Sequence, residues 1–130
     1  MNSKYDEESV DYEEMEDWLK NYFLDPLTSF CDQTQFRIDL YETATEWIVE
    51  AILSDFETSE ISVFIDEKKL VISAAKHPPS AKLPKKTRTI DFPFQIITQK
   101  VNASFKNGIL EVFISKTEKE LGKNRFVTLP

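Results

Sequence analysis

The chain is short of the residue types from which most active sites are built. Among its 130 residues it has two glycines, Gly108 and Gly122, too few for a glycine-rich phosphate loop or a dinucleotide-binding fingerprint. Its single histidine, His77, and single cysteine, Cys31, cannot supply a tetrahedral zinc site or an internal disulfide. We therefore expect no cofactor, no metal and no need for an oxidising compartment during folding.

Catalytic chemistry is also poorly represented. His77 stands beside Pro78 in a basic stretch, with no acid or nucleophile in a pattern that would make it a general base. Asp55, Glu57 and Glu60 cluster before an apolar run, and this clustering does not place two carboxylates across a substrate. The sequence predicts a protein that is not an enzyme and has no small-molecule substrate.

Long apolar runs and excess positive charge are missing as well. No run approaches the ~18 apolar residues that span a bilayer, and the polar start resembles no secretion signal, so we expect a soluble, intracellular protein. The net charge of −7 argues against nucleic acid as a partner. Residues 1–17, the acidic segment, carry all of that charge, because they hold eight acids against Lys4 alone.

Helical periodicity marks the N-terminal part. Apolar residues recur there at the spacing that places them on one helical face: Met15, Trp18, Leu19, Tyr22 and Phe23. The helix is expected to stop before Pro26. An isolated helix of this length is marginal in water, so its aromatic face must dock on something. It packs either on its own body or on another protein, and the sequence leaves both open.

From Phe36 onward the apolar residues alternate with a period of two. Seven short runs follow one another without a convincing helix between them, which predicts an all-β, immunoglobulin-like antiparallel β-sandwich. The runs are centred on residues 36–40, 47–53, 61–65, 70–74, 90–94, 101–105 and 110–114. The predicted organisation is an acidic N-terminal arm with an amphipathic helix (1–35), the sandwich (36–116) and an extended C-terminal tail (117–130).

Two connections stand out between these runs. Asn107-Gly108 is a strong signal for a two-residue hairpin turn, since both residues tolerate positive φ. Between Ala75 and Thr87, prolines and lysines predict a loop that cannot be a central strand. Its basic patch, Lys82, Lys85, Lys86 and Arg88, either protects a sheet edge from pairing or attracts the acidic segment of a neighbouring molecule.

Several of these residues resemble a known family. The run from Ala103 through Asn107-Gly108 to Leu110 is similar to the A-x-x-x-N-G-V-L signature that closes the α-crystallin domain of small heat shock proteins. Arg88 followed by Phe92-Pro93 resembles another family region. Val127-Thr128-Leu129 resembles the C-terminal motif that docks into a groove on a neighbouring domain. The resemblance implies an α-crystallin-type sandwich, oligomers, an assembly clip at Val127 and Leu129, and action without nucleotide hydrolysis.

A narrower similarity runs through the arm and the body. Four segments resemble diverged α-crystallin-domain proteins of bacterial spore coats: Asp17-Trp18-Leu19, Phe23-x-Asp25-Pro26, 38–43 and 48–51. This branch implies a structural or germination-associated component of the spore coat, with coat proteins or further copies as partners. The alternative is a cytoplasmic, ATP-independent holdase. Its contacts with unfolding clients, or with other partners, would come from Trp18, Leu19, Tyr22 and Phe23.

Overall fold

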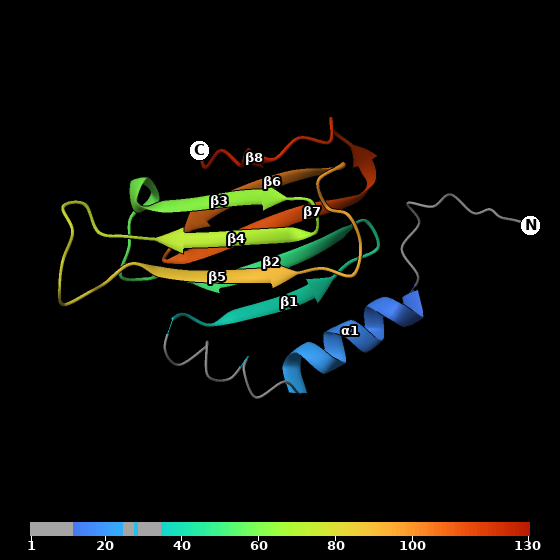
Figure 1. Cartoon of the computed structure of the whole chain (residues 1–130), viewed down its shortest axis with the longest axis horizontal. Coiled ribbons are helices and arrows are strands. Elements are labelled where there is room, and N and C mark those ends of the chain that lie inside the picture. Colours follow the sequence, from blue (N-terminus) through green and yellow to red (C-terminus); the bar gives the residue numbers. More distant parts are fainter. Residues whose placement is uncertain (1–11, 25–27, 29–34) are drawn as a thin grey trace, which may run out of the picture.

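The computed structural model describes residues 12–24, 28 and 35–130 of the chain. Two four-stranded antiparallel sheets face each other, one in the order β1-β2-β7-β6 and the other in the order β5-β4-β3-β8 (Figure 1). This confirms the predicted β-sandwich with an N-terminal helix. The elements are α1 (Tyr12–Leu24), β1 (Ile38–Glu42), β2 (Glu46–Ile52), a 3-10 turn (Thr58–Glu60), β3 (Ile61–Asp66), β4 (Lys69–Ala74), β5 (Lys86–Asp91), β6 (Gln99–Lys106), β7 (Ile109–Lys119) and β8 (Arg125–Phe126).

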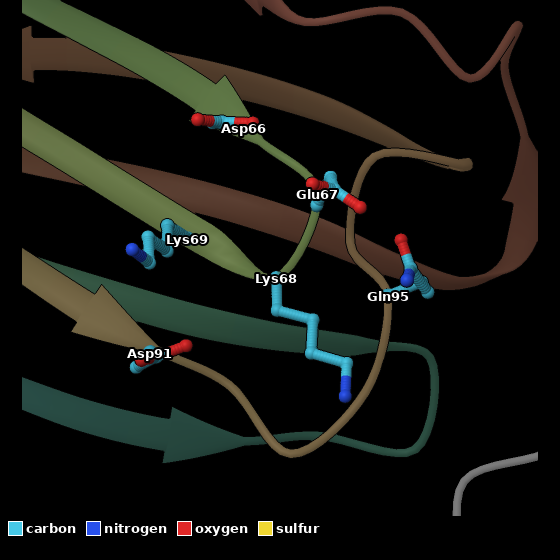
Figure 2. Close-up of a pocket in the computed structure, with 6 residues that line it drawn as sticks. All are labelled: Asp66, Glu67, Lys68, Lys69, Asp91 and Gln95. Atoms are coloured by element: carbon cyan, nitrogen blue, oxygen red, sulfur yellow. The ribbon is translucent and has the colours of Figure 1, made fainter.

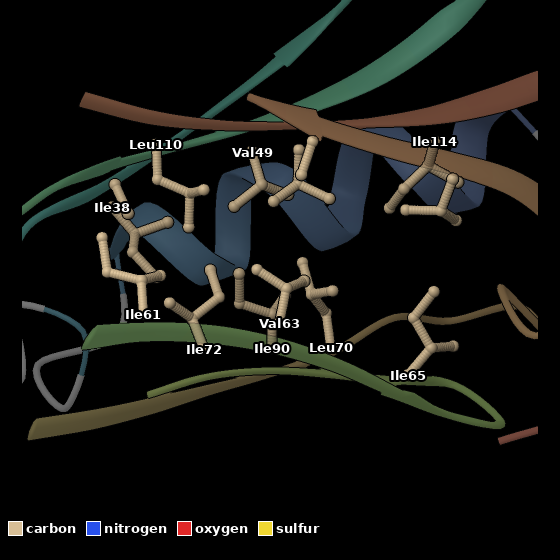
Figure 3. Close-up of a cluster of buried hydrophobic side chains, with 14 of the residues drawn as sticks. Ile38, Val49, Ile61, Val63, Ile65, Leu70, Ile72, Ile90, Leu110 and Ile114 are labelled. Carbon is tan, nitrogen blue, oxygen red and sulfur yellow. The ribbon is translucent and has the colours of Figure 1, made fainter. Parts of the chain in front are cut away.

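The core lies between the two sheets and is built from aliphatic side chains of both. Because side chains alternate across a strand, every second residue of β2, β3 and β4 is buried. Figure 3 shows Ile38, Val49, Leu110 and Ile114 of the first sheet facing aliphatic residues of the second. Trp47 and Phe36 are also buried in this core.

The hairpin between β6 and β7 fixes the pairing of the central strands. Asn107 and Gly108 both have positive φ, 53° and 79°, as the predicted two-residue turn requires. The turn places Ala103 opposite Val112, with both side chains in the core. Because a slip of one residue would turn every side chain to the other face, this turn determines which residues of β7 are buried.

Several strands differ from the sequence prediction. The run expected to continue through Phe92 and Phe94 ends as strand β5 at Asp91, because Pro93 has no N–H to donate to a ladder. Strand β7 continues to Lys119, inside the segment expected as a tail. The short strand β8 adds a pairing that the alternation did not predict.

Candidate interaction surfaces

Helix α1 packs on the sandwich of its own chain, the first of the two alternatives. The Trp18 ring stacks on Phe92 with centroids 5.0 Å apart, and Tyr22 lies 5.8 Å from Trp18. Leu19, like these two, is partly buried against the core. The side chain of Phe23 lies outside the described residues, as do Cys31 and residues 1–11. The aromatic face is therefore an intramolecular contact that leaves part of each described side chain exposed.

Arg88 connects this helix to the sandwich. Its side chain is only 5% exposed. It donates to the main-chain oxygen of Phe36 at 2.7 Å and to the Tyr22 hydroxyl at 3.0 Å. The prediction that Arg88 belongs to the basic patch of the loop is therefore wrong. Arg88 shares the inward face of β5 with Ile90, two positions away, and this parity was the available signal.

The C-terminal tail lies along the edge of β3. Strand β8 pairs Phe126 with Phe64 and Arg125 with Ile65, and the Val127 N–H donates to the Val63 carbonyl at 2.8 Å. The proposed clip residues, Val127 and Leu129, are partly buried against the core. The tail thus completes the second sheet by strand addition, using main-chain hydrogen bonds and alternate side chains.

Arg125 anchors the tail at the start of β8. Its guanidinium donates to the carbonyls of Ile97 and Gln99, both at 2.8 Å, and to that of Lys123 at 3.0 Å. The sequence does not predict a role for Arg125, because two of its three partners are main-chain oxygens 26 and 28 residues away, for which the sequence carries no signal. This anchor fixes the position at which the next residues of the tail, including Val127 and Leu129, meet the sandwich.

The basic loop, residues 75–86, is held at its base by Glu60. The Glu60 carboxylate accepts hydrogen bonds from the Glu57 N–H at 2.9 Å and the His77 N–H at 3.1 Å, and it pairs with Lys76 at 3.4 Å. The Glu57 bond foremost, then the His77 bond and Lys76, lower the pKa of Glu60 below its ordinary value. The Glu60 carboxylate therefore contacts the main chain of His77, and the His77 side chain is exposed.

One surface cavity, with a volume of about 200 Å³, lies at the opposite end of β4. Charged side chains from the β3–β4 turn and the end of β5 surround it, as Figure 2 shows for Glu67, Lys68 and Asp91. Both charge signs are present and the lining has no aromatic side chain. Within the described part of the chain, no three His, Cys, Asp or Glu side chains converge as metal ligands, and no helical segment has the length and apolar character of a bilayer crossing.

Several known proteins are similar to this chain in sequence or in structure. The family model for the Hsp20/alpha crystallin family matches residues 39–129. Spore coat protein M of Bacillus subtilis strain 168 is 25% identical over 130 residues, which covers 100% of this chain and 94% of that protein. Small heat shock protein C2 of Rickettsia felis is 29% identical over 122 residues, covering 85% of this chain and 78% of that protein.

Solved structures show the same fold. A mutant of hsp14.1 from Sulfolobus solfataricus P2 is 28% identical and superposes with a TM-score of 0.52, over 60% of this chain and 74% of that one. A second mutant of the same protein gives a TM-score of 0.56 at 24% identity, over 82% of this chain and 99% of that one. The β-sandwich fold is thus shared with these structures.

Proposed function

This chain belongs to the Hsp20/alpha crystallin family, and from that premise we propose that it is a non-enzymatic, self-assembling structural component of a bacterial spore coat. Family membership supports a chaperone-like or self-assembling role. The observation that carries the finer proposal is the extent of the similarity to spore coat protein M. It covers the whole chain, including the N-terminal arm that precedes the family match at residue 39.

Self-assembly in this proposal uses the tail clip, Val127 and Leu129. The tail adds to the β3 edge through a short strand, and the five residues before β8, 120–124, are all exposed. An element joined by an exposed connection can leave its own domain and make the same contacts on a second copy, which is the low-cost route of domain swapping. Each such link is weak, and several links in one assembly act together through multivalency.

A second candidate function is that of an ATP-independent holdase. The observation that favours it is the aromatic contact between Trp18 and Phe92, which joins α1 to the sandwich. If α1 detaches, both rings become exposed together, and exposed aromatic patches bind other proteins. Trp18, Leu19, Tyr22 and Phe23 would then contact unfolding clients, as would the uncovered side of the sandwich. The 29% identity to a small heat shock protein supports this reading.

One assay separates the two functions. A heat-denaturing test protein is followed by light scattering, with and without this chain, in the absence of ATP. The structural proposal predicts that aggregation continues at a near-stoichiometric ratio. Suppression of aggregation would favour the holdase instead. If α1 supplies the client contacts, the double variant Trp18→Ala/Tyr22→Ala should then no longer suppress aggregation. A Lys123→Ala chain, altered at an exposed site away from α1, is the matched control.

A further inference from the structure

The basic loop presents a patch of uncompensated positive charge. No acid occurs anywhere between residues 75 and 90 of the sequence. Lys82 and Lys85 are exposed and Lys86 is half-buried. None of the three forms an ion pair with any residue that the structure describes, whereas Lys76 and Lys116 pair with Glu60 and Glu42. The patch is therefore free to attract an anionic partner.

The loop that carries this patch is held in place. Glu60 binds its first residues through the His77 N–H and the Lys76 ammonium. Leu83, between the lysines, is partly buried against the core. The Lys82 N–H bonds to the Ser80 hydroxyl at 3.2 Å. These contacts hold Lys82 and Lys85 outward from a fixed base, so a partner would meet a positioned group of charges.

The same chain contains a segment of opposite charge. Residues 1–17 hold eight acids and one lysine, and Glu16 and Asp17 are exposed on the first half of α1. The first turn of α1 lies at one end of the molecule, and the basic loop projects at the other, as Figure 1 shows. Contact between them within one chain would require the acidic segment to run back along the sandwich. Two copies placed end to end bring the opposite charges together directly.

We propose that the basic loop of one copy binds the acidic segment, residues 1–17, of a second copy. The contact is heterologous, because different surfaces of the two copies meet, so it propagates into a ring or an open chain of subunits. Each exposed ion pair contributes little and is screened by salt, and the interaction depends on many charges facing one another. This end-to-end contact is separate from the tail clip and adds a second, salt-sensitive direction of assembly.

The test measures weight-average mass by light scattering at about 10 mM and about 1 M salt, where the Debye length is about 30 Å and about 3 Å. Four chains are compared with the natural one. The loop variant carries Lys82→Glu, Lys85→Glu and Lys86→Glu. The charge-matched control carries the same change at three exposed lysines elsewhere, Lys68, Lys106 and Lys123. The arm variant carries Asp6→Lys, Glu7→Lys and Glu8→Lys. The double variant combines loop and arm changes and restores the natural net charge.

The proposal predicts that the natural chain at least doubles in mass on going from high to low salt. The loop variant and the arm variant each lose this increase, while the charge-matched control keeps it and the double variant regains it. Equal loss in the loop variant and the control would overturn the proposal, because net repulsion would then explain both. A natural chain with the same mass at low and high salt would overturn the proposal as well.

Two features keep this result interpretable. A chain with Lys82→Glu and Lys85→Glu alone changes only residues outside strands, so it repeats the test if Lys86, in β5, affects folding. At high salt the charge contact is screened, so the change in mass on removal of the tail reports on the clip alone. Failure of the charge contact is therefore distinguishable from failure of the self-assembly proposed above.

Discussion

At the scale of single residues, Gly108 meets two demands at once. Its φ of +79° is unfavourable for any residue with a Cβ, and a Cβ built there would lie 2.8 Å from the Cα and Cβ of Ser54. Its carbonyl also accepts the Leu53 N–H at 2.8 Å, so the turn cannot move away from Ser54 without losing this bond. The sequence indicated the turn from Asn107-Gly108, but the contact with Ser54, 54 residues earlier in the chain, has no sequence signal.

Gly108→Ala should therefore lower the free energy of unfolding by about 2 kcal/mol or more, from the left-handed backbone and the overpacking together. The measurement is urea unfolding followed by tryptophan fluorescence. Gly122→Ala is the matched control, because Gly122 is exposed and its nearest neighbour is the movable Thr98 methyl at 3.3 Å. Equal stability of the two variants would contradict the account of this turn.

Glu60 makes a second residue-scale prediction, on pH. Its folded pKa is lowered, chiefly by the Glu57 N–H, so ionised Glu60 stabilises the fold at pH values above its unfolded pKa of about 4.3. That stability is lost as the pH falls through the folded pKa. Glu60→Gln should reduce Tm at pH 7 and flatten the fall in Tm between about pH 5 and pH 3. A parallel fall in both chains would show that Glu60 does not hold the loop through its charge.

At the scale of elements, alternation explains why most strands were predictable. A sandwich strand buries every second residue, so the runs at β2, β3 and β4 could be read directly from the sequence. The end of β5 was harder, because Phe92 continues the apolar alternation and is buried, yet belongs to a loop that turns at Pro93. Strand β8 is two residues long and depends on tertiary contacts that periodicity cannot contain.

Helix α1 is an element whose contribution to stability should differ from its contribution to binding. Leu110 is fully buried, so Leu110→Ala should cost about 2–5 kcal/mol of unfolding free energy. Trp18 is half-buried and outside the sheets, so Trp18→Ala should cost less than Leu110→Ala and should instead expose α1 to proteolysis. Urea unfolding and limited proteolysis measure the two effects. If Trp18→Ala costs as much as Leu110→Ala, α1 is part of the core.

At the scale of the whole molecule, the two terminal elements associate with different parts of one sandwich. Helix α1 contacts the β5 side through Arg88 and Phe92, and the tail completes the β3 edge through Arg125. The sequence predicted helix α1 and the apolar residues of both terminal segments, but not that the tail forms a strand on β3. It did not predict the positioning roles of Arg88 and Arg125, since each binds at least one main-chain oxygen that only the fold brings close.

The central claim is that this chain assembles through its own tail, and truncation tests it most directly. A chain ending at Arg125 lacks Val127 and Leu129 but keeps the anchoring side chain. Light scattering at high salt, where the charge contact is screened, compares its mass with that of the full chain and of a Thr128→Ala control, which changes an exposed side chain between the two clip residues. The account predicts smaller assemblies for the truncated chain and unchanged assemblies for the control. An unchanged mass after truncation would contradict the claim.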